Sequence, residues 1–494
     1  MRALPSALRE EATEYDVEEA RTSRGTFDDS AGSLLLSQIA AKGAGARAPG
    51  AGGDSRRAFS DAFVEKRYLC FAAAAALIKY LESESGLLTG AVVSVRFEDP
   101  EHVCVLDNRT ILGLNLVRSR RGSAHGDPTS PSLFDVLGAN VRTVGGRKLL
   151  RQNIVQPPRD VGTIEARLRA VEELLDSETL LPDAAGLIAS FPRDFESVVC
   201  GSFAIPMPSR SSRSSAPRLA ALIRNLLRLK DALCLVESAA PFFEGVESEL
   251  LVAIGGVCRE GVLLELRDAI ADVLSPTVGA DDRTLNTRAQ ICFALRPGVD
   301  GMLDRSRECF SEITEAVNAR AAEYREVHAL PSLRLGFTEG KQFFITFKEG
   351  ERASTPEDFQ LVNVRGATVH ATTQEIISLN LRLSTVSEDC MHLTEKHLWG
   401  LHERVQDAMD ALSNLSESLS FLDMLTGFAS LVQRAREAGG GVYTRPRIDA
   451  RSPFALRDAR HPLLDPTGSG RFVANNLYLS PLRSMVIVQG SNMR

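Results

Sequence analysis

The chain has 494 residues, of which 44% are hydrophobic and 24% are charged. These shares are typical of a folded globular protein, and the length predicts roughly three domains. The net charge of -7 excludes a protein that binds nucleic acid through an overall positive charge, so any such binding must use a local basic patch. The longest apolar run, Phe71 to Ile78, is too short to cross a membrane, and the acidic N-terminus lacks a secretory signal.

The eight cysteines are spread along the chain without any CxxC pair. Zinc fingers and dense disulfide frameworks need closely spaced cysteines, so this spacing disfavours both. We therefore expect buried free thiols in a protein of a reducing compartment.

The first part of the chain mixes three patterns. Residues 41–57 are rich in Gly, Ala and Arg and predict a flexible linker. Residues 61–84 are Ala-rich and apolar and predict a helix. Residues 92–106 alternate apolar with polar positions, which predicts two strands with a turn at Asp99–Pro100.

A second polar segment, 119–130, predicts another solvated loop. Apolar residues then recur at helical spacing over 132–175. Asp160 or Thr163 is the expected N-cap of a helix that starts at Ile164, because a short polar side chain can accept from the free N–H groups of the first turn.

The Ser-rich segment 208–216 predicts a third loop, and residues 217–327 continue the helical pattern. Arg210 and Arg213 in this loop could touch phosphate, although a solvated loop is the simpler interpretation.

A β-rich island interrupts the helices. Residues 333–348 predict a hairpin with a turn at Glu339–Gly340, and residues 360–369 predict one or two further strands.

No proline occurs from Glu357 to Arg445, and apolar residues keep a spacing of three to four. This pattern predicts one helix from Gln374 to Ala438, on the order of 100 Å long, that ends at three glycines. A globular domain does not need such a helix, so we expect a lever or strut.

After the three glycines the helical pattern ends and a strand pattern begins. Residues 442–465 predict short strands, and Ser484–Val488 predicts a strand that runs into Gly490. An apolar strand that ends in Gly can begin a phosphate-binding loop, whose backbone N–H groups hold phosphates. Alone this signal is weak, because a chance strand and turn gives the same pattern.

Taken in this order, the features resemble the MutS family. The resemblance covers nearly the whole chain from about residue 68. It is carried by S-L-F-x-x-L at Ser132–Leu137, R-H-P at Arg460–Pro462, F-V-A-N-N from Phe472, and a strand followed by G-x-N-M from Gly490. The repair members begin with a domain whose Phe-x-Glu wedge reads mismatches. No room for it exists ahead of the connector remnant, so the resemblance favours the meiotic branch of the family.

The resemblance implies a mostly α fold with smaller α/β parts. The expected domains are a connector remnant with its linker (1–60), a helical core and lever (61–325), a β-rich clamp (326–383), the returning lever helix (384–438) and the start of a P-loop ATPase domain (439–494). On this interpretation the sequence is truncated within the Walker A loop.

In this family two levers end in clamps that cross the DNA, and such a ring needs only sequence-independent phosphate contacts. The candidate DNA contacts are the clamp cations Arg334, Lys341, Lys348, Arg352 and Arg365. A solvated charged hairpin is the alternative interpretation of the same residues.

The residues that match the family's nucleotide pocket are Phe472, expected to stack on adenine, and Gly490, Ser491 and Asn492 of the phosphate loop. ATP and Mg²⁺ are expected for the full-length family member. The Walker A Lys and Ser/Thr are missing, so we expect this fragment to lack catalytic residues, metal ligands and ATPase activity, and nucleotide binding by it is doubtful.

The resemblance implies a nuclear DNA-clamp subunit that binds branched recombination DNA such as Holliday junctions in meiotic crossing-over, paired with MutS homologue five. One alternative is a mismatch-repair ATPase that binds mismatched DNA. The other is a non-enzymatic helical scaffold that binds only protein.

Overall fold

The computed structural model describes residues 23–44, 67–85, 103–117, 131–203, 216–275, 287–338, 342–354, 359–365, 368–437, 443–449, 453–464 and 473–489. The chain divides into two compact units, Met1–Asp99 and Pro100–Arg494.

The first unit contains a pair of helices that pack against each other, α2 (Asp29–Ala44) and α5 (Tyr68–Ser85), preceded by the short 3-10 helix η1 (Arg24–Thr26). Helix α5 confirms the helix predicted over 61–84 for the residues that the structure describes. Its buried side chains include Phe71, Ala75 and Ala76, so the small alanines allow the two helices to approach closely.

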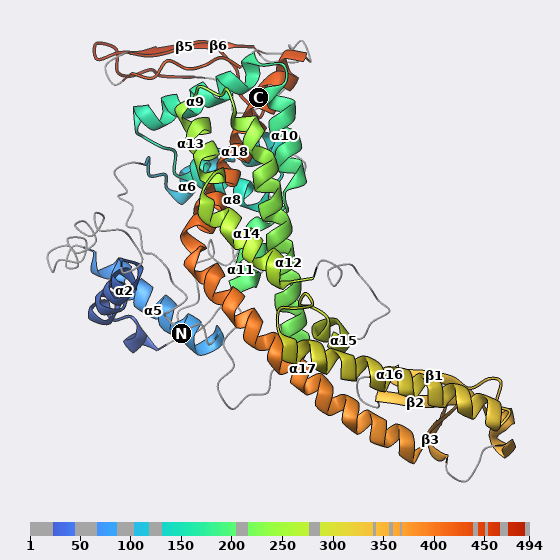
Figure 1. Cartoon of the computed structure of the whole chain (residues 1–494). Coiled ribbons are helices and arrows are strands. Elements are labelled where there is room, and N and C mark those ends of the chain that lie inside the picture. The colour runs from blue at the N-terminus through green and yellow to red at the C-terminus, as the bar shows by residue number, and fades with distance from the viewer. Residues whose placement is uncertain are drawn as a thin grey trace. The chain divides into compact units, whose positions relative to one another are not determined.

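The second unit is mainly helical, in agreement with the predicted fold class (Figure 1). Its helices before the sheet are α6 (Asn108–Gly113), α7 (Leu133–Leu137), η4 (Gly138–Asn140), α8 (Val144–Val155), α9 (Val161–Asp176), α10 (Leu180–Ser190), α11 (Phe195–Phe203), α12 (Ala216–Ala239), η5 (Ala240–Phe243), α13 (Glu249–Cys258), α14 (Gly261–Val273), α15 (Thr287–Cys292) and α16 (Gly301–Val327).

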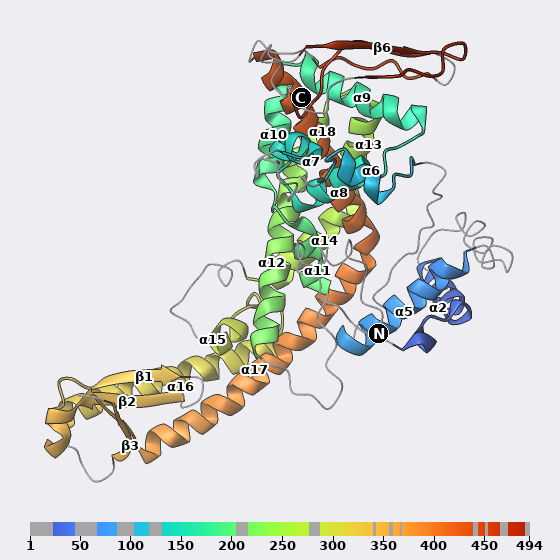
Figure 2. The same ribbon diagram turned by 180° about the vertical axis from the view of Figure 1, so that it is seen from behind.

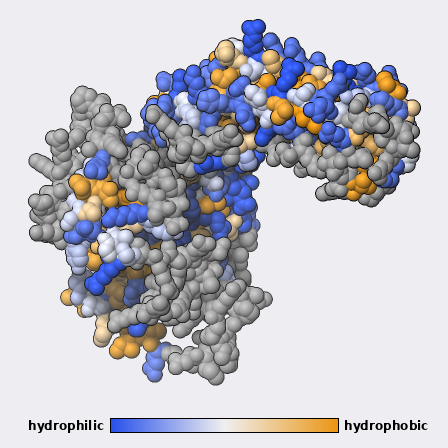
Figure 3. All heavy atoms as spheres, turned by 90° about the horizontal axis from the view of Figure 1, so that it is seen from below, coloured by the Kyte–Doolittle hydropathy of each residue, from blue (hydrophilic) through white to orange (hydrophobic). Residues whose placement is uncertain are grey.

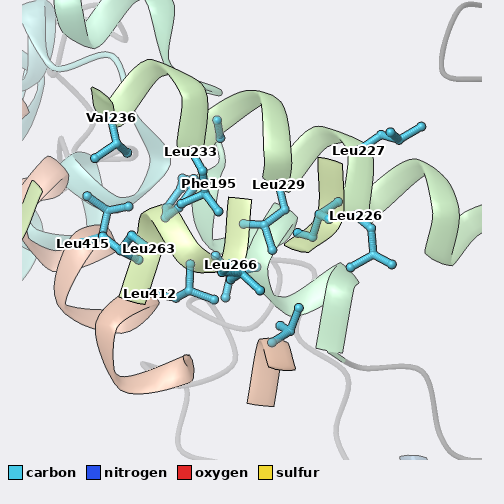
Figure 4. Close-up of a cluster of buried hydrophobic side chains, with 14 of the residues drawn as sticks. Phe195, Leu226, Leu227, Leu229, Leu233, Val236, Leu263, Leu266, Leu412 and Leu415 are labelled. Atoms are coloured by element: carbon cyan, nitrogen blue, oxygen red, sulfur yellow. The ribbon is translucent and has the colours of Figure 1, made fainter. Parts of the chain in front are cut away.

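Two helices follow the sheet, α17 (Gln374–Asp407) and α18 (Met409–Glu437). Helix α18 is the centre of the helical body, where α8, α9, α10 and α13 pack around it. Every residue from Leu422 to Gly427 is buried, so the helix has no solvent face over this stretch. Figure 4 shows part of this core, in which leucines of α12 and α14 face Leu412 and Leu415 of α18.

The single helix predicted over 374–438 is wrong in one respect. A turn at Ala408 (φ -88°, ψ 3°) separates α17 from α18. Neither Pro nor Gly lies there, so tertiary packing sets the break. Ala408 is 3% exposed and lies in one hydrophobic core with Leu401 of α17 and Leu412 of α18.

One helix start was predicted from a local signal. Asp160 is the N-cap of α9 and accepts from the Thr163 N–H at 2.7 Å, so the helix starts at Val161 rather than at Ile164. Ser132 caps α7 in a reciprocal capping box with Asp135.

The predicted β-rich island is a four-stranded antiparallel sheet of order β1-β2-β4-β3. Its strands are β1 (Arg334–Thr338), β2 (Gln342–Lys348), β3 (Gln360–Arg365) and β4 (Thr368–Thr372), with the 3-10 helix η7 (Glu349–Ser354) after β2. The predicted hairpin is confirmed by the pairing of β1 with β2.

Within the second unit, α16 and α17 run side by side away from the helical body and carry this sheet at their far end (Figures 1 and 2). We call α16, α17 and the four strands the arm. In Figure 3 the surface of the arm is mostly hydrophilic, with scattered hydrophobic residues.

The last described strands, β5 (Phe454–Ala459) and β6 (Asn475–Leu479), form an antiparallel pair, as predicted for part of 442–465. The strand predicted at Ser484–Val488 is wrong, because residues 484–489 have no regular structure. Ile487 and Val488 are 83% and 88% exposed. A strand needs a neighbour for its hydrogen bonds, and none pairs with this segment among the described residues.

Several predictions fall outside the described residues. They are the linker beyond Ala44, the strands at 92–102, the loops at 119–130 and 208–215, and the turn at Glu339–Gly340. Within residues 103–106 only Val103 joins a sheet pairing, through an isolated bridge to Pro158.

All eight cysteines are free, as predicted, but the expectation that they are buried is wrong for five of them. The exposed thiols are Cys70, Cys104, Cys200, Cys234 and Cys309. Four of these lie on outward positions of helices, where a small apolar side chain costs little.

Among the helices that the structure describes, none combines the length and the apolar character needed to span a membrane.

Candidate nucleic-acid interface

The four strands of the arm have an unusual charge pattern. Their sequences are RLGFT, QFFITFK, QLVNVR and TVHAT, which contain three cations and a histidine but no aspartate or glutamate. Glu339 follows β1 directly in the sequence, and Glu349 and Glu351 lie in η7 after β2. The Ser332 hydroxyl donates a hydrogen bond to the Glu351 carboxylate at 2.7 Å.

The strand register collects the charged positions on one face. Two adjacent rows cross the sheet there, Arg334–Thr346–His370 and Lys348–Thr368–Arg365. Because successive residues of a strand point to opposite faces, all six positions belong to the same face. We call it the cationic face.

The opposite face of the sheet forms a small core with the helices of the arm. Ile345, Phe347 and Val369 are buried there against residues that include Ala321 of α16 and Ile376 of α17. Arg334 and Lys348 on the cationic face are exposed. The burial pattern of the sheet therefore places Arg334 and Lys348 on its solvent side, where a large anionic ligand can reach them.

An aromatic pair lies within the cationic face. The rings of Phe344 and His370 are stacked, with centroids 5.1 Å apart and an interplanar angle of 24°. Phe344 also covers Gly336, where a Cβ atom would come within 2.8 Å of its ring. His370 Nδ1 is buried without a hydrogen-bond partner among the described residues. This pair was not predicted from the sequence. The alternation of residues in TVHAT nevertheless places His370 on the face of the sheet opposite to that of the buried residues Val369 and Ala371.

Polar contacts fix the sheet to the ends of the arm helices. The Asn380 amide of α17 donates to the Phe343 carbonyl at 2.9 Å and accepts from the Phe343 N–H at 3.2 Å. Tyr324 of α16 donates to Glu375 at 2.7 Å and lies 3.2 Å from the Thr373 hydroxyl that caps α17. The cationic face is thus held in a fixed orientation relative to α16 and α17.

The middle of the arm has the opposite charge. Residues 308–319 of α16 and 383–395 of α17 contain no lysine or arginine. Their carboxylates are Glu308, Glu312, Glu315, Glu388, Asp389 and Glu395. Phosphates would be repelled from this stretch.

Comparison with known proteins identifies the architecture. A family model described as MutS domain III matches residues 109–429, which include the helical body and the whole arm. The chain belongs to the MutS family. The family resemblance predicted from the sequence motifs is therefore confirmed.

Relatives of this MutS chain include two proteins named for homologue four. It is 30% identical over 477 residues to "DNA mismatch repair protein MSH4" of Arabidopsis thaliana, covering 95% of this chain and 58% of that protein. It is 28% identical over 435 residues to "MutS protein homolog 4" of Mus musculus, covering 87% and 43%.

A bacterial relative, "DNA mismatch repair protein MutS" of Salinibacter ruber, is 27% identical over 425 residues, covering 85% of this chain and 43% of that protein. The chain thus spans about half the length of the relatives that it matches.

The structure brings some of the predicted DNA contacts of this MutS chain together. Arg334 and Lys348 share the exposed cationic face, and the register places position 365 in the row of Lys348. Position 352 lies in η7. The side chains of Arg352 and Arg365, and the whole of Lys341, lie outside the described residues.

The predicted nucleotide contacts Phe472, Gly490, Ser491 and Asn492 all lie outside the described residues. The described part of the chain contains no cluster of His, Cys, Asp or Glu that could hold a metal ion.

Proposed function

We propose that this MutS chain is a DNA-holding clamp subunit, and that the cationic face of its sheet contacts the phosphate backbone of duplex arms. The observation that carries the proposal is the charge of that face. Every charged position on the four strands is a cation or a histidine, and the register gathers all of them on the side that faces away from the core.

Phosphate contacts suit this face better than base contacts. Arg334 and Lys348 lie on one face of a four-stranded sheet, which is wider than the two-stranded ribbon that the major groove admits. Cations placed in this way neutralise phosphates and release counterions, which gives binding that is independent of sequence and weakened by salt. We include Lys341, Arg352 and Arg365 in the proposed contact set because they border or belong to the same sheet.

We propose meiotic recombination as the process, because two of the relatives carry the name of homologue four. The corresponding substrate is branched DNA such as a Holliday junction, the partner is MutS homologue five, and the location is the nucleus. The ring closed by the two chains would act as a sliding clamp.

ATP with Mg²⁺ is the proposed regulator of that ring in the full-length family member. Phe472, Gly490, Ser491 and Asn492 are the proposed nucleotide contacts.

Mismatch repair is the second candidate function. The names of the Arabidopsis and Salinibacter relatives include "DNA mismatch repair", which favours a mismatched duplex as substrate. The two candidates differ in the DNA that should bind best.

A competition experiment separates them. The full chain is first bound to a labelled four-way junction. Three unlabelled competitors of equal length are then added in separate titrations: the four-way junction, a mismatched duplex and a matched duplex. Under the leading proposal the junction competes best and the two duplexes are equal. A mismatched duplex that competes better than a matched one would favour mismatch repair, and absence of binding to all three would favour a protein-binding scaffold.

A further inference from the structure

A cavity of about 360 Å³ lies where α10 packs against α18. One wall is apolar and consists of Leu181, Pro182 and Ala185 of α10. Asn140, the last residue of η4, also lines the cavity. The opposite wall is a polar stripe of α18 whose members lie three or four residues apart: Ser430, Gln433, Arg434 and Glu437. An apolar wall facing a few polar groups is typical of sites that bind small organic molecules, and the volume is in their range.

The cavity is open to solvent. Pro182 on the apolar wall is exposed, and so are Gln433 and Arg434 on the polar wall. A small molecule can therefore enter without any change in the packing of the two helices. No residue of the arm lines the cavity, so it is a different site from the cationic face.

Arg434 supplies a positive charge to the polar wall. No carboxylate in the described part of the chain forms an ion pair with its guanidinium. A guanidinium presents several N–H donors in one plane, and two of them match the two oxygens of a carboxylate. Because Arg434 has no carboxylate of its own, it is available to an anionic group that enters the cavity.

Two further features favour an anion. The amide nitrogen of Asn140 is buried and has no hydrogen-bond partner among the residues that the structure describes. Buried polar atoms normally have a partner, and an acceptor atom of a ligand would supply one. Leu181 and Pro182 lie in the first turn of α10, at the positive end of the helix dipole, where the N-cap Thr179 makes no side-chain hydrogen bond.

Glu437 limits how much negative charge the cavity accepts. Its carboxylate accepts a hydrogen bond from the Gln433 amide at 2.9 Å. It also lies in the last turn of α18, at the negative end of that helix dipole. A group with two or more negative charges would be repelled by this carboxylate. One unpaired cation next to one carboxylate therefore favours a ligand with a single negative charge.

We propose that this cavity binds a small organic acid, with the carboxylate held by Arg434 and Asn140 and the apolar body against Leu181, Pro182 and Ala185. The inference does not depend on the proposed DNA-binding function, because the cavity shares no residue with the cationic face.

The test uses the full chain with sodium hexanoate as the probe, and binding is followed by saturation-transfer NMR of the probe at constant ionic strength. Hexanol and hexylamine carry the same apolar chain without the negative charge. We expect both to bind at least about tenfold more weakly than hexanoate, because they cannot accept charge-assisted hydrogen bonds from Arg434. A capped tetrapeptide with a single glutamate shows whether an acidic protein segment is the better ligand.

The matched variants are Arg434→Ala and Arg436→Ala, since Arg436 is exposed in the same turn of α18 but does not line the cavity. Arg434→Ala should weaken hexanoate binding by about tenfold or more, and Arg436→Ala should leave it unchanged. Ala185→Leu should weaken binding as well, because the larger side chain fills the cavity without altering its charge. Circular dichroism spectra check that each variant is folded.

Several results would overturn the proposal. They are the absence of hexanoate binding to the wild type at millimolar concentrations, equal affinities for hexanol and hexanoate, and equal affinities of the wild type and Arg434→Ala for hexanoate. Tighter binding of the tetrapeptide than of hexanoate would assign the cavity to an acidic protein segment in place of a free acid.

Discussion

The carboxylate of Asp423 holds Thr143 by two hydrogen bonds, from the backbone N–H at 2.7 Å and from the side-chain hydroxyl at 2.6 Å. The Arg142 N–H also donates to it at 3.1 Å. Asp423 lies in the buried part of α18 and is 1% exposed, while Thr143 is the N-cap of α8. One buried charge of the central helix therefore fixes the start of a helix 280 residues away in sequence.

Replacing Asp423 by Asn should destabilise the protein by about 2 kcal/mol, because a neutral amide is a weaker acceptor and turns its own N–H₂ group toward backbone donors. The free energy of unfolding in urea measures the loss. The matched control is Asp272→Asn on α14, where the carboxylate is exposed and a change within about 0.5 kcal/mol is expected. Equal losses for the two variants would show that the hydrogen bonds to Thr143 carry no special stability.

Gly146 must remain glycine for the same contact to form. A Cβ atom there would lie 2.5 Å from a carboxylate oxygen of Asp423 and 2.8 Å from the Thr143 hydroxyl. Gly146→Ala should therefore cost about 1–3 kcal/mol despite the better helix propensity of alanine.

Gly186 in α10 is the control for this substitution, because no atom lies within 4 Å of a Cβ built there. Gly186→Ala should stabilise the protein by about 0.5–1 kcal/mol. Thermal melts should move in opposite directions for the two variants. A stabilising Gly146→Ala would mean that α8 and α18 are less tightly packed than described.

His402 should make stability depend on pH. It is 5% exposed, and burial lowers its pKa below the ordinary value of 6.5, while contacts with the Ser202 carbonyl only partly compensate. The unfolded chain therefore takes up a proton near pH 6.5 that the native chain does not. The free energy of unfolding should fall as the pH drops below about 6.5, down to the lower native pKa.

The free energy of unfolding in urea is measured from pH 8 to pH 5 for the wild type and for His402→Gln. The difference between the two isolates the contribution of His402, because the contributions of the other titrating groups cancel. The wild type should lose stability relative to the variant as the pH falls. The exposed residue His392 of α17 provides the control variant His392→Gln. A pH-independent difference for His402→Gln would contradict the assignment of His402 as a buried neutral histidine.

Much of the fold could be predicted because its signals are local. The hairpin of β1 and β2 follows from alternation around a short turn, and the Asp160 cap from one side chain and its neighbours. The cations Arg334 and Lys348 lie on the two strands of this hairpin, whose register places them on one face. The addition of position 365 to that face depends on β4 and β3, which come later in the chain.

The remaining features depend on tertiary contacts. The break at Ala408 has no local signal, because neither Pro nor Gly lies there and the same core continues on both sides of it. In the sequence Asp423 is one polar residue in a helical pattern, and only the folded structure shows its hydrogen bonds to Thr143. The segment 484–488 has the composition of a strand, but composition does not supply the neighbour that a strand needs.

The dependence of DNA binding on salt tests the central claim most directly. The binding constant of the full chain for a four-way junction is measured at several salt concentrations, for the wild type, for Arg334→Ala with Lys348→Ala, and for the control Arg224→Ala with Arg228→Ala on the exposed face of α12. If the cationic face contacts phosphates, the first double variant binds more weakly, and the slope of log K against log salt becomes shallower by about 2, with no change for the control. A slope that is the same for the wild type and both double variants would contradict a phosphate contact at this face.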